Sequence, residues 1–177
     1  MPVTRGAGGQ AAAGLAWEAT RSAWQGLLQP CRGRRDLAAR GVLGGLIIRK
    51  PGAALAVELL AALVSAAVGN QWGITTLYSG LAQGIGAELV FLALAYRRWG
   101  LVPAALAGAG AAVGEWILEF VMGNIAKSAA FNLIYLVTMI ISGAVLAGGI
   151  GWALAKALAA SGALSRFASG REARTDI

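Results

Sequence analysis

The chain has 177 residues and a net charge of +7; 58% of its residues are apolar or aromatic, 13% are charged and 26 are glycine. This composition is typical of a helical membrane bundle and not of a soluble domain. Histidine is absent, Cys31 is the only cysteine and no aspartate lies between residues 37 and 175, which excludes a Cys/His metal site, a Ser-His-Asp triad and an intramembrane aspartyl protease. We therefore expect a protein that is not an enzyme and that holds no metal and no cofactor.

Residues 1–40 are predicted to be a basic N-terminal segment that does not span a membrane. Apolar residues between Ala11 and Gln29 alternate with Glu18 and Arg21, a weakly amphipathic pattern that indicates an interfacial helix. Pro30 ends it, and a basic loop is expected up to residue 40. Two interpretations stay open: a natural interfacial helix, or a front end altered by truncation or a frame shift.

Residues 41–160 are predicted to form one transmembrane helical domain. The apolar run 41–48 is too short to cross a bilayer core of about 30 Å, and it resembles the last turns of a helix. Longer runs of about 20 residues or more are long enough to cross, at about 51–69, 74–95, 101–122 and 130–159. We expect an all-α integral membrane protein with four full transmembrane helices plus the partial helix, followed by a cytoplasmic tail at 161–177.

The basic residues set the expected orientation. Arg49–Lys50, Arg97–Arg98 and the tail from Lys156 to Arg174 fall on one side by alternation, while the other side carries only Lys127. The positive-inside rule makes the first side cytoplasmic, so we predict a multi-pass protein of the cell membrane with a cytoplasmic C-terminus. No basic helix or aromatic RNA-binding motif accompanies these residues, and we expect no nucleic-acid partner.

Small residues recur at i, i+4 in the third and fourth spans, as in Ala104 and Gly108 or Gly143 and Ala147. Such residues let helices approach closely. Packing within the chain and packing against a partner protein are both open.

Polar and aromatic side chains gather in the outer half of the predicted bundle, with Gln83 near mid-depth. Glu115 and Glu119 lie one helical turn apart, which places them on one face. Carboxylates are costly inside a bilayer and commonly face a ligand, a partner or a cavity. We predict one outward-facing pocket that suits a flat, heteroaromatic, neutral-to-cationic ligand; its candidate residues are Gln71, Trp72, Gln83, Glu115, Trp116, Glu119, Asn132 and Tyr135.

Several of these residues have a plainer interpretation. Trp72 also fits an interfacial aromatic belt, and Glu119 also fits a solvated carboxylate or one paired with Lys127. Glu58 and Glu88 lie in the inner half of the bundle. A structural or coupling role is favoured for Glu58. Glu88 is kept among the binding candidates, with ion pairing, a partner contact and a deeper cavity all open.

The segment from Ile47 to Gly100 carries a family resemblance. Its RKPGAA start, QWG turn, SGLxQGxGAE helix and YRRWG exit together resemble the YkoE family, the substrate-binding S components of energy-coupling factor (ECF) transporters for thiamine or its hydroxymethylpyrimidine precursor. The resemblance implies a six-helix membrane protein that captures the vitamin from outside. It also implies a transmembrane coupling subunit and two cytoplasmic ATPases as partners, and the chain itself has no GxxxxGK[ST] loop. The chain departs from the family pattern at its front, where no first span is present.

Two other function classes remain as alternatives. A stand-alone membrane transporter or channel would use Glu115 and Glu88 as proton or cation relays. A structural or assembly subunit would dock other helices through its small-residue faces and would bind no ligand. The vitamin-binding S component is the favoured hypothesis.

Overall fold

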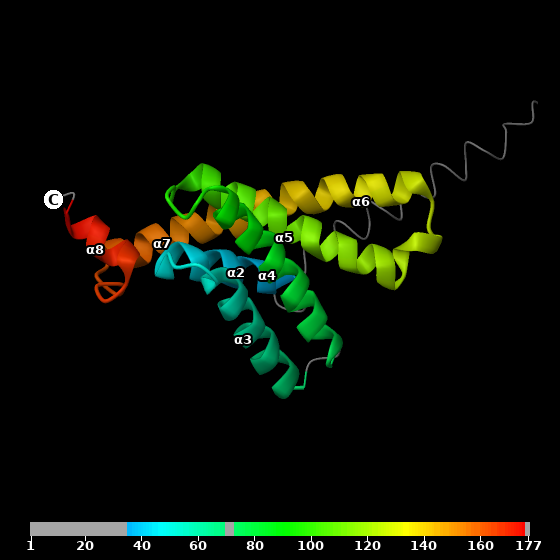
Figure 1. Ribbon diagram of the computed structural model, residues 1–177, viewed down its shortest axis with the longest axis horizontal. Coiled ribbons are helices and arrows are strands. Elements are labelled where there is room, and N and C mark those ends of the chain that lie inside the picture. Colours follow the sequence, from blue (N-terminus) through cyan, green and yellow to red (C-terminus); the bar gives the residue numbers. More distant parts are fainter. Residues whose placement is uncertain (1–34, 70–72, 176–177) are drawn as a thin grey trace, which may run out of the picture.

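The computed structural model describes residues 35–69 and 73–175, with the side chains of residues 39–69 and 73–172. All regular elements in this part of the chain are helices (Figure 1). In chain order they are α2 (Arg35–Ile48), α3 (Ala53–Ala67), α4 (Thr75–Ala93), α5 (Leu101–Met122), the 3-10 helix η1 (Asn124–Ala126), α6 (Ala129–Ser142), the π-helix η2 (Gly143–Ile150), α7 (Gly151–Ala160) and α8 (Ala168–Thr175). The interfacial helix predicted at 11–29 lies outside the described residues.

α2 is longer than the partial helix predicted at 41–48. It begins at Arg35, so the prediction of a loop up to residue 40 is wrong for residues 35–40. The sequence Leu37-Ala38-Ala39 consists of strong helix formers, which favours a helix here. Val42 and Leu46 are buried in the core, where they pack with Ala54 of α3 and Phe91 of α4.

α3 and α4 form an antiparallel hairpin whose helices are each shorter than the predicted spans 51–69 and 74–95. Gly52 precedes α3 with φ of +81°, which sets a turn before the first helical residue. After α4, Ala95 and Tyr96 both have positive φ, 50° and 54°. This left-handed conformation ends the helix two residues earlier than predicted.

α5 has the same bounds as the span predicted at 101–122. α6, η2 and α7 run on as one helix of 32 residues, Ala129–Ala160, close to the predicted 130–159. By length and hydropathy, α5 and this long helix are each suited to crossing a membrane, whereas α3 is apolar but shorter. Polar residues within α4, such as Ser79 and Gln83, lower its hydropathy.

The small residues of α5 and η2 pack against each other within this chain. A Cβ atom built on Gly108 would lie 2.2 Å from the Gly143 carbonyl oxygen, and one on Gly86 of α4 would lie 2.1 Å from the Gly110 carbonyl oxygen. The backbones of α4, α5 and η2 therefore touch at positions where only glycine fits. Intramolecular packing thus accounts for Gly108 and Gly143, one of the two interpretations that the sequence left open.

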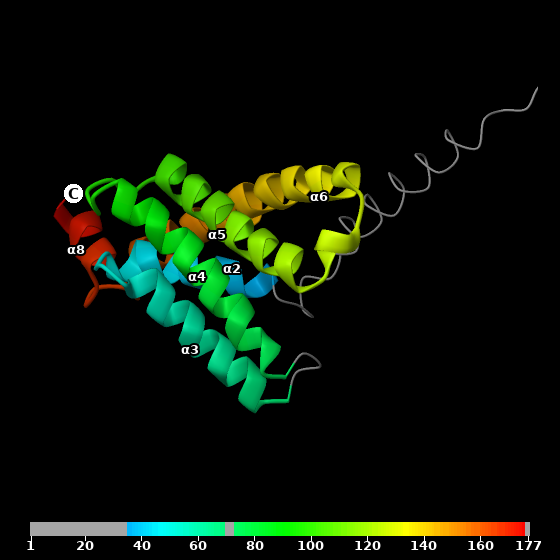
Figure 2. The same ribbon diagram turned by 45° about the vertical axis from the view of Figure 1, so that its right-hand side comes forward.

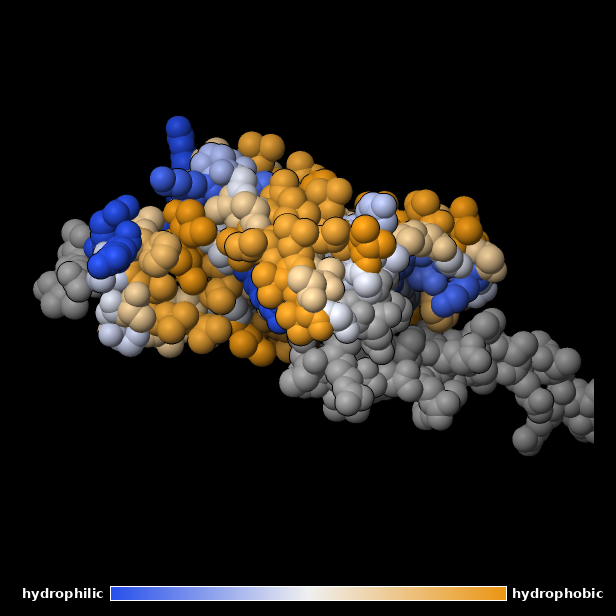
Figure 3. Space-filling model, turned by 90° about the horizontal axis from the view of Figure 1, so that it is seen from below, coloured by the Kyte–Doolittle hydropathy of each residue, from blue (hydrophilic) through white to orange (hydrophobic). Residues whose placement is uncertain are grey.

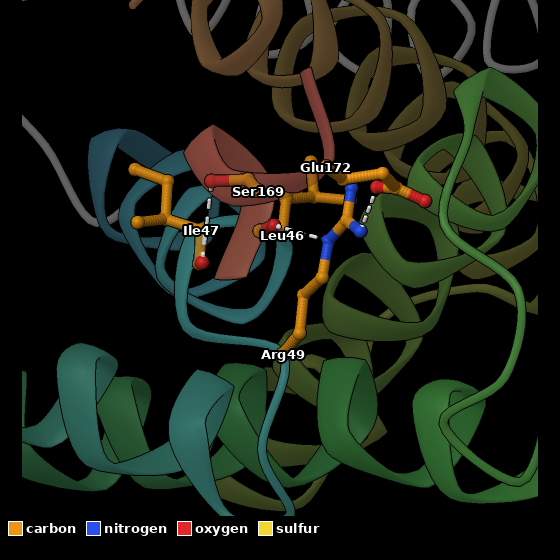
Figure 4. Close-up of polar contacts among 5 residues, drawn as sticks. All are labelled: Leu46, Ile47, Arg49, Ser169 and Glu172. Atoms are coloured by element: carbon orange, nitrogen blue, oxygen red, sulfur yellow. Dashed lines mark hydrogen bonds and ion pairs between the residues drawn. The ribbon is translucent and has the colours of Figure 1, made fainter. Parts of the chain in front are cut away.

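α8 folds back against the C-terminal end of α2. The Ser169 hydroxyl donates to the Ile47 carbonyl at 3.3 Å, and Arg49 forms an ion pair with Glu172 (Figure 4). We call this end of the bundle the α8 end, and the opposite end the η1 end. From the α8 end the α3–α4 and α5–α6 pairs diverge in both ribbon views (Figure 1, Figure 2). Hydrophobic side chains cover the middle of the face seen in Figure 3, and hydrophilic ones gather toward its two ends.

Candidate functional site

A buried polar cluster joins α4 to α5. The Ser79 hydroxyl donates to Oε2 of Glu115 at 2.7 Å, and the Gln83 amide donates to the same oxygen at 3.1 Å and to Ser79 Oγ at 2.9 Å. The exposed fractions of Ser79, Gln83 and Glu115 are 0%, 2% and 2%. The structure thus brings together two of the predicted site residues, Gln83 and Glu115, and adds Ser79.

Local sequence explains how this cluster forms. Ser79 and Gln83 are four residues apart on α4 and therefore lie on the same face. That face meets α5 where a Cβ atom on Gly114 would lie 2.1 Å from the Ala82 carbonyl oxygen. The close approach of the two backbones lets the short Ser79 side chain reach Glu115 directly.

Two cavities lie along the seam between α5 and the long helix that begins with α6. The inner cavity has a volume of about 40 Å³ and is lined by Gln83, Glu115, Met139, Ser142 and Leu146, among others. The second cavity, at the η1 end, has a volume of about 310 Å³ and a lining that includes Glu119, Lys127, Phe131 and Tyr135. We refer to them as the inner cavity and the η1-end cavity.

A hydrogen bond joins α5 to α6 at the edge of the η1-end cavity nearest the inner cavity. The Tyr135 hydroxyl donates to the Glu119 carboxylate, and each residue lies one helical turn closer to the η1 end than Met139 and Glu115 of the inner cavity. The Tyr135 ring also stacks on Phe131, with centroids 5.8 Å apart and an interplanar angle of 20°. Lys127 lies over the Phe131 ring at 4.3 Å, so the η1-end cavity has an aromatic wall with one cation and one carboxylate beside it.

Trp116 and Asn132 are engaged within the chain and line neither cavity. The Trp116 indole nitrogen donates to the Asn132 carbonyl at 3.2 Å, and its ring stacks on Phe120 at 5.2 Å. The Asn132 amide nitrogen donates to the carbonyls of Asn124, Ser128 and Lys127 at 3.0, 3.2 and 3.4 Å. Both side chains therefore hold α6 and the η1 turn against α5.

Glu88 is also absent from the two cavities and lies at the α8 end. Its carboxylate accepts hydrogen bonds from the backbone nitrogens of Gly52, Ala54 and Leu55 at 2.5, 3.1 and 3.3 Å, and from the Tyr96 hydroxyl at 2.6 Å. Glu88 thus caps the N-terminus of α3, where backbone N–H groups lack helical partners. The structure does not place it with Glu115. Hydrogen bonding to this carboxylate raises the pKa of Tyr96 to about 12.

Glu58 is buried among α2, α3 and α4, with an exposed fraction of 1%. A Cβ atom built on Gly41 would lie 2.2 Å from Oε2 of Glu58, and one built on Gly84 would lie 3.2 Å from the Glu58 Cβ. Glycines on both neighbouring helices therefore make the space that this side chain occupies.

Gln71 and Trp72 lie outside the described residues, so their predicted role stays a prediction. Sequence reasoning missed Ser79 and Phe131. Both carried a usable signal, because Ser79 precedes Gln83 by four residues and Phe131 precedes Tyr135 by four, a spacing that puts each pair on one helix face.

Comparison with known proteins gives three matches. A family model described as "ABC-type cobalt transport system, permease component" matches residues 37–114. The Bacillus subtilis (strain 168) protein named "Putative HMP/thiamine permease protein YkoE" is 45% identical over 132 residues, which cover 74% of this chain and 66% of that protein. The chain thus spans about two thirds of the length of this relative.

The third match is a solved structure. It is described as "Crystal structure of an S-component of ECF transporter", and it superposes with a TM-score of 0.74 at 35% identity, over 92% of this chain and 86% of that one. Identity at this level over most of both chains, together with the all-helical architecture, shows common descent and a common fold. The chain belongs to the family of ECF transporter S components.

Proposed function

We propose that this chain is the substrate-binding membrane subunit of an ECF-type transporter and that it captures thiamine or its hydroxymethylpyrimidine precursor. The name of the Bacillus subtilis relative supports this ligand class, and the S-component fold supports the binding role. The chain acts by binding and reorientation and performs no catalysis.

One observation carries the proposal: a carboxylate, an amide and a hydroxyl share a buried cluster beside the inner cavity. Burying a carboxylate in such surroundings is costly unless it meets a cation or hydrogen-bond donors. An aminopyrimidine offers amino and ring-nitrogen groups, and thiamine adds a cationic thiazolium. Glu115 would balance the ligand's charge or accept from its amino group, while Gln83 and Ser79 orient that carboxylate.

The sizes of the cavities suggest how the ligand reaches this cluster. Pockets for small organic ligands usually have volumes of about 300–1,000 Å³, so the η1-end cavity of about 310 Å³ is large enough for a first encounter. The inner cavity of about 40 Å³ is too small. We propose that the ligand first stacks on Tyr135 and Phe131, and that the hydrogen bond from Tyr135 to Glu119 then opens as α6 moves away from α5.

Gln71 and Trp72 are proposed to complete the outer rim, and Trp116 and Asn132 to support it from behind through their contacts between α5 and α6. The basic residues at the α8 end favour a cytoplasmic location for that end and for the C-terminus in the cell membrane. On this side we propose docking of a transmembrane coupling subunit with its two ATPase subunits.

The test is the affinity of purified chain for thiamine and for hydroxymethylpyrimidine, measured by isothermal titration calorimetry in detergent. Glu115→Gln should weaken the binding of thiamine by about 1–3 kcal/mol, the scale of a charge-assisted hydrogen bond, or about 5- to 150-fold in Kd. Glu172→Gln is the matched control, because it makes the same chemical change at the opposite end of the bundle. Equal affinities for all three proteins would remove Glu115 from the site.

A further inference from the structure

A third cavity, lined by charged and aromatic side chains, lies at the α8 end, far from the proposed vitamin site. It has a volume of about 200 Å³ and lies between α2, α7, α8 and the segment that follows α4. Its lining includes Arg49, Trp99, Trp152, Lys156, Ser169 and Glu172. Figure 4 shows Arg49 extending from the end of α2 toward Glu172 on α8. Neither the S-component fold nor the proposed vitamin binding accounts for this cavity.

Two cations in the cavity are each held on an aromatic surface. The Arg49 guanidinium carbon lies 5.5 Å from the centroid of the Trp99 ring, and the Lys156 ammonium lies 5.1 Å from the centroid of the Trp152 ring. Cation–π contacts fix the position of these charges without neutralising them. Arg49 is further positioned by its hydrogen bond to the Leu46 carbonyl at 3.2 Å. The cavity therefore holds two positioned cations, of which Arg49 is paired with Glu172.

Among the described residues that line the cavity, Glu172 is the carboxylate, and an incoming anion can replace it. Glu172 pairs with Arg49, but its side chain is 59% exposed, whereas that of Arg49 is 18% exposed. An exposed carboxylate loses little on returning to water, because its pairing in that setting is weak. A phosphate that bridged Arg49 and Lys156 would form charge-assisted contacts with two cations, whereas Glu172 forms its ion pair with Arg49.

The position of the cavity favours a lipid as the source of the phosphate. Leu154 of α7, two residues from Lys156 and Trp152, is 47% exposed on the apolar surface of the bundle. Tryptophan and basic residues at the end of an apolar span are typical of the headgroup layer, and basic pockets between membrane helices on the cytoplasmic side bind anionic headgroups. We propose that this cavity binds the phosphate group of an anionic phospholipid of the cytoplasmic leaflet.

The orientation of the bundle is the only part of the proposed function on which this inference rests. An occupied cavity would join α2, α7 and α8 through one bridging phosphate, next to the ion pair that holds α8 in place. Anionic lipid would then stabilise the docked position of α8.

The test uses native mass spectrometry of the full chain in a neutral detergent, titrated with phosphatidylglycerol or with phosphatidylcholine. The wild-type chain should bind one phosphatidylglycerol in preference to phosphatidylcholine. Lys156→Gln should weaken that binding about fivefold, which corresponds to about 1 kcal/mol per basic residue at a membrane surface. Lys50→Gln, which removes an exposed charge at the same end but outside the cavity, should leave the affinity within twofold of wild type.

Glu172→Gln should have the opposite effect on lipid affinity. It removes the competing carboxylate and should therefore strengthen the binding of phosphatidylglycerol. All of these side-chain changes are at exposed positions. An unchanged helical circular dichroism spectrum shows that each variant is folded, so this test stands even if the chain fails to bind thiamine. Equal losses for Lys156→Gln and Lys50→Gln, or no preference for phosphatidylglycerol, would overturn the proposal. Displacement of the lipid by an equal concentration of glycerol phosphate or inorganic phosphate would also overturn it, by showing that the site takes soluble phosphate.

Discussion

Glu88 offers the sharpest test of the fold, because one carboxylate joins the start of α3 to the end of α4. Glu88→Ala removes the acceptor for three backbone N–H groups and for the Tyr96 hydroxyl. An N-terminal cap contributes about 0.5–2 kcal/mol, its charge at the helix terminus about 0.3–1 kcal/mol, and one further hydrogen bond about 0.5–1.5 kcal/mol. Since the site is only half-buried and water replaces part of this loss, we expect a destabilisation of about 2–3 kcal/mol.

The assay is equilibrium unfolding in mixed micelles, followed by the helical circular dichroism signal. Tyr96→Phe alone should cost about 1 kcal/mol, since it removes one hydrogen bond of the four. A double-mutant cycle of Tyr96→Phe with Glu88→Ala should give a coupling free energy of up to about 1 kcal/mol between the two side chains. Glu172→Ala serves as the control carboxylate, because it is exposed and its pairing is expected to contribute less than about 1 kcal/mol.

The reasoning fails if Glu88→Ala destabilises the chain no more than Glu172→Ala. It also fails in a second way, if Glu88→Gln loses vitamin binding while its free energy of unfolding is unchanged. That result would return Glu88 to the ligand site, one of the roles that the sequence alone had left open for it.

Three further predictions follow from single contacts. Gly108→Ala should destabilise the chain by about 1–3 kcal/mol through overpacking against Gly143, whereas Gly151→Ala, whose Cβ meets nothing within 4 Å, should be neutral or slightly stabilising in the same unfolding assay. The Tyr96 phenol should ionise near pH 12, measured by tyrosinate absorbance, and in Glu88→Gln its pKa should fall back toward 10. Because the folded state favours the neutral phenol, the associated stabilisation is present below about pH 10 and is lost as the pH rises through 12. Tyr135→Phe should speed thiamine association in stopped-flow fluorescence, since it removes the hydrogen bond that joins α5 to α6 beside the η1-end cavity, and an unchanged rate would exclude a gating role.

Hydropathy predicted most of the helices, because long apolar runs bounded by basic residues report directly on membrane spans. The third span is the clearest case, with the bounds Leu101–Met122 in both prediction and structure. α2 was only partly predicted. Its basic first turns carry no hydropathy signal, and what stabilises the helix is burial of Val42 and Leu46 against α3 and α4, which is a tertiary effect.

The candidate site was predicted in part. Glu115 and Gln83 meet as expected, because helical spacing places a residue on a face and hydropathy gives its approximate depth. Spacing cannot say which neighbour a side chain finds, and so Trp116 was included among the pocket residues, whereas its ring stacks on Phe120. Glu88 shows the same limit. Its carboxylate meets the start of α3 only because the α3–α4 hairpin closes on itself, and nothing local in the sequence records that contact.

The central claim is that the chain binds the vitamin by itself but depends on partner subunits to move it across a membrane. The most direct measurement is uptake of labelled thiamine into proteoliposomes that hold this chain, with or without the coupling subunit, the two ATPases and internal ATP. We predict saturable binding by the chain alone and uptake only with the full set and ATP. Uptake by the chain alone would contradict the account and would establish a stand-alone transporter.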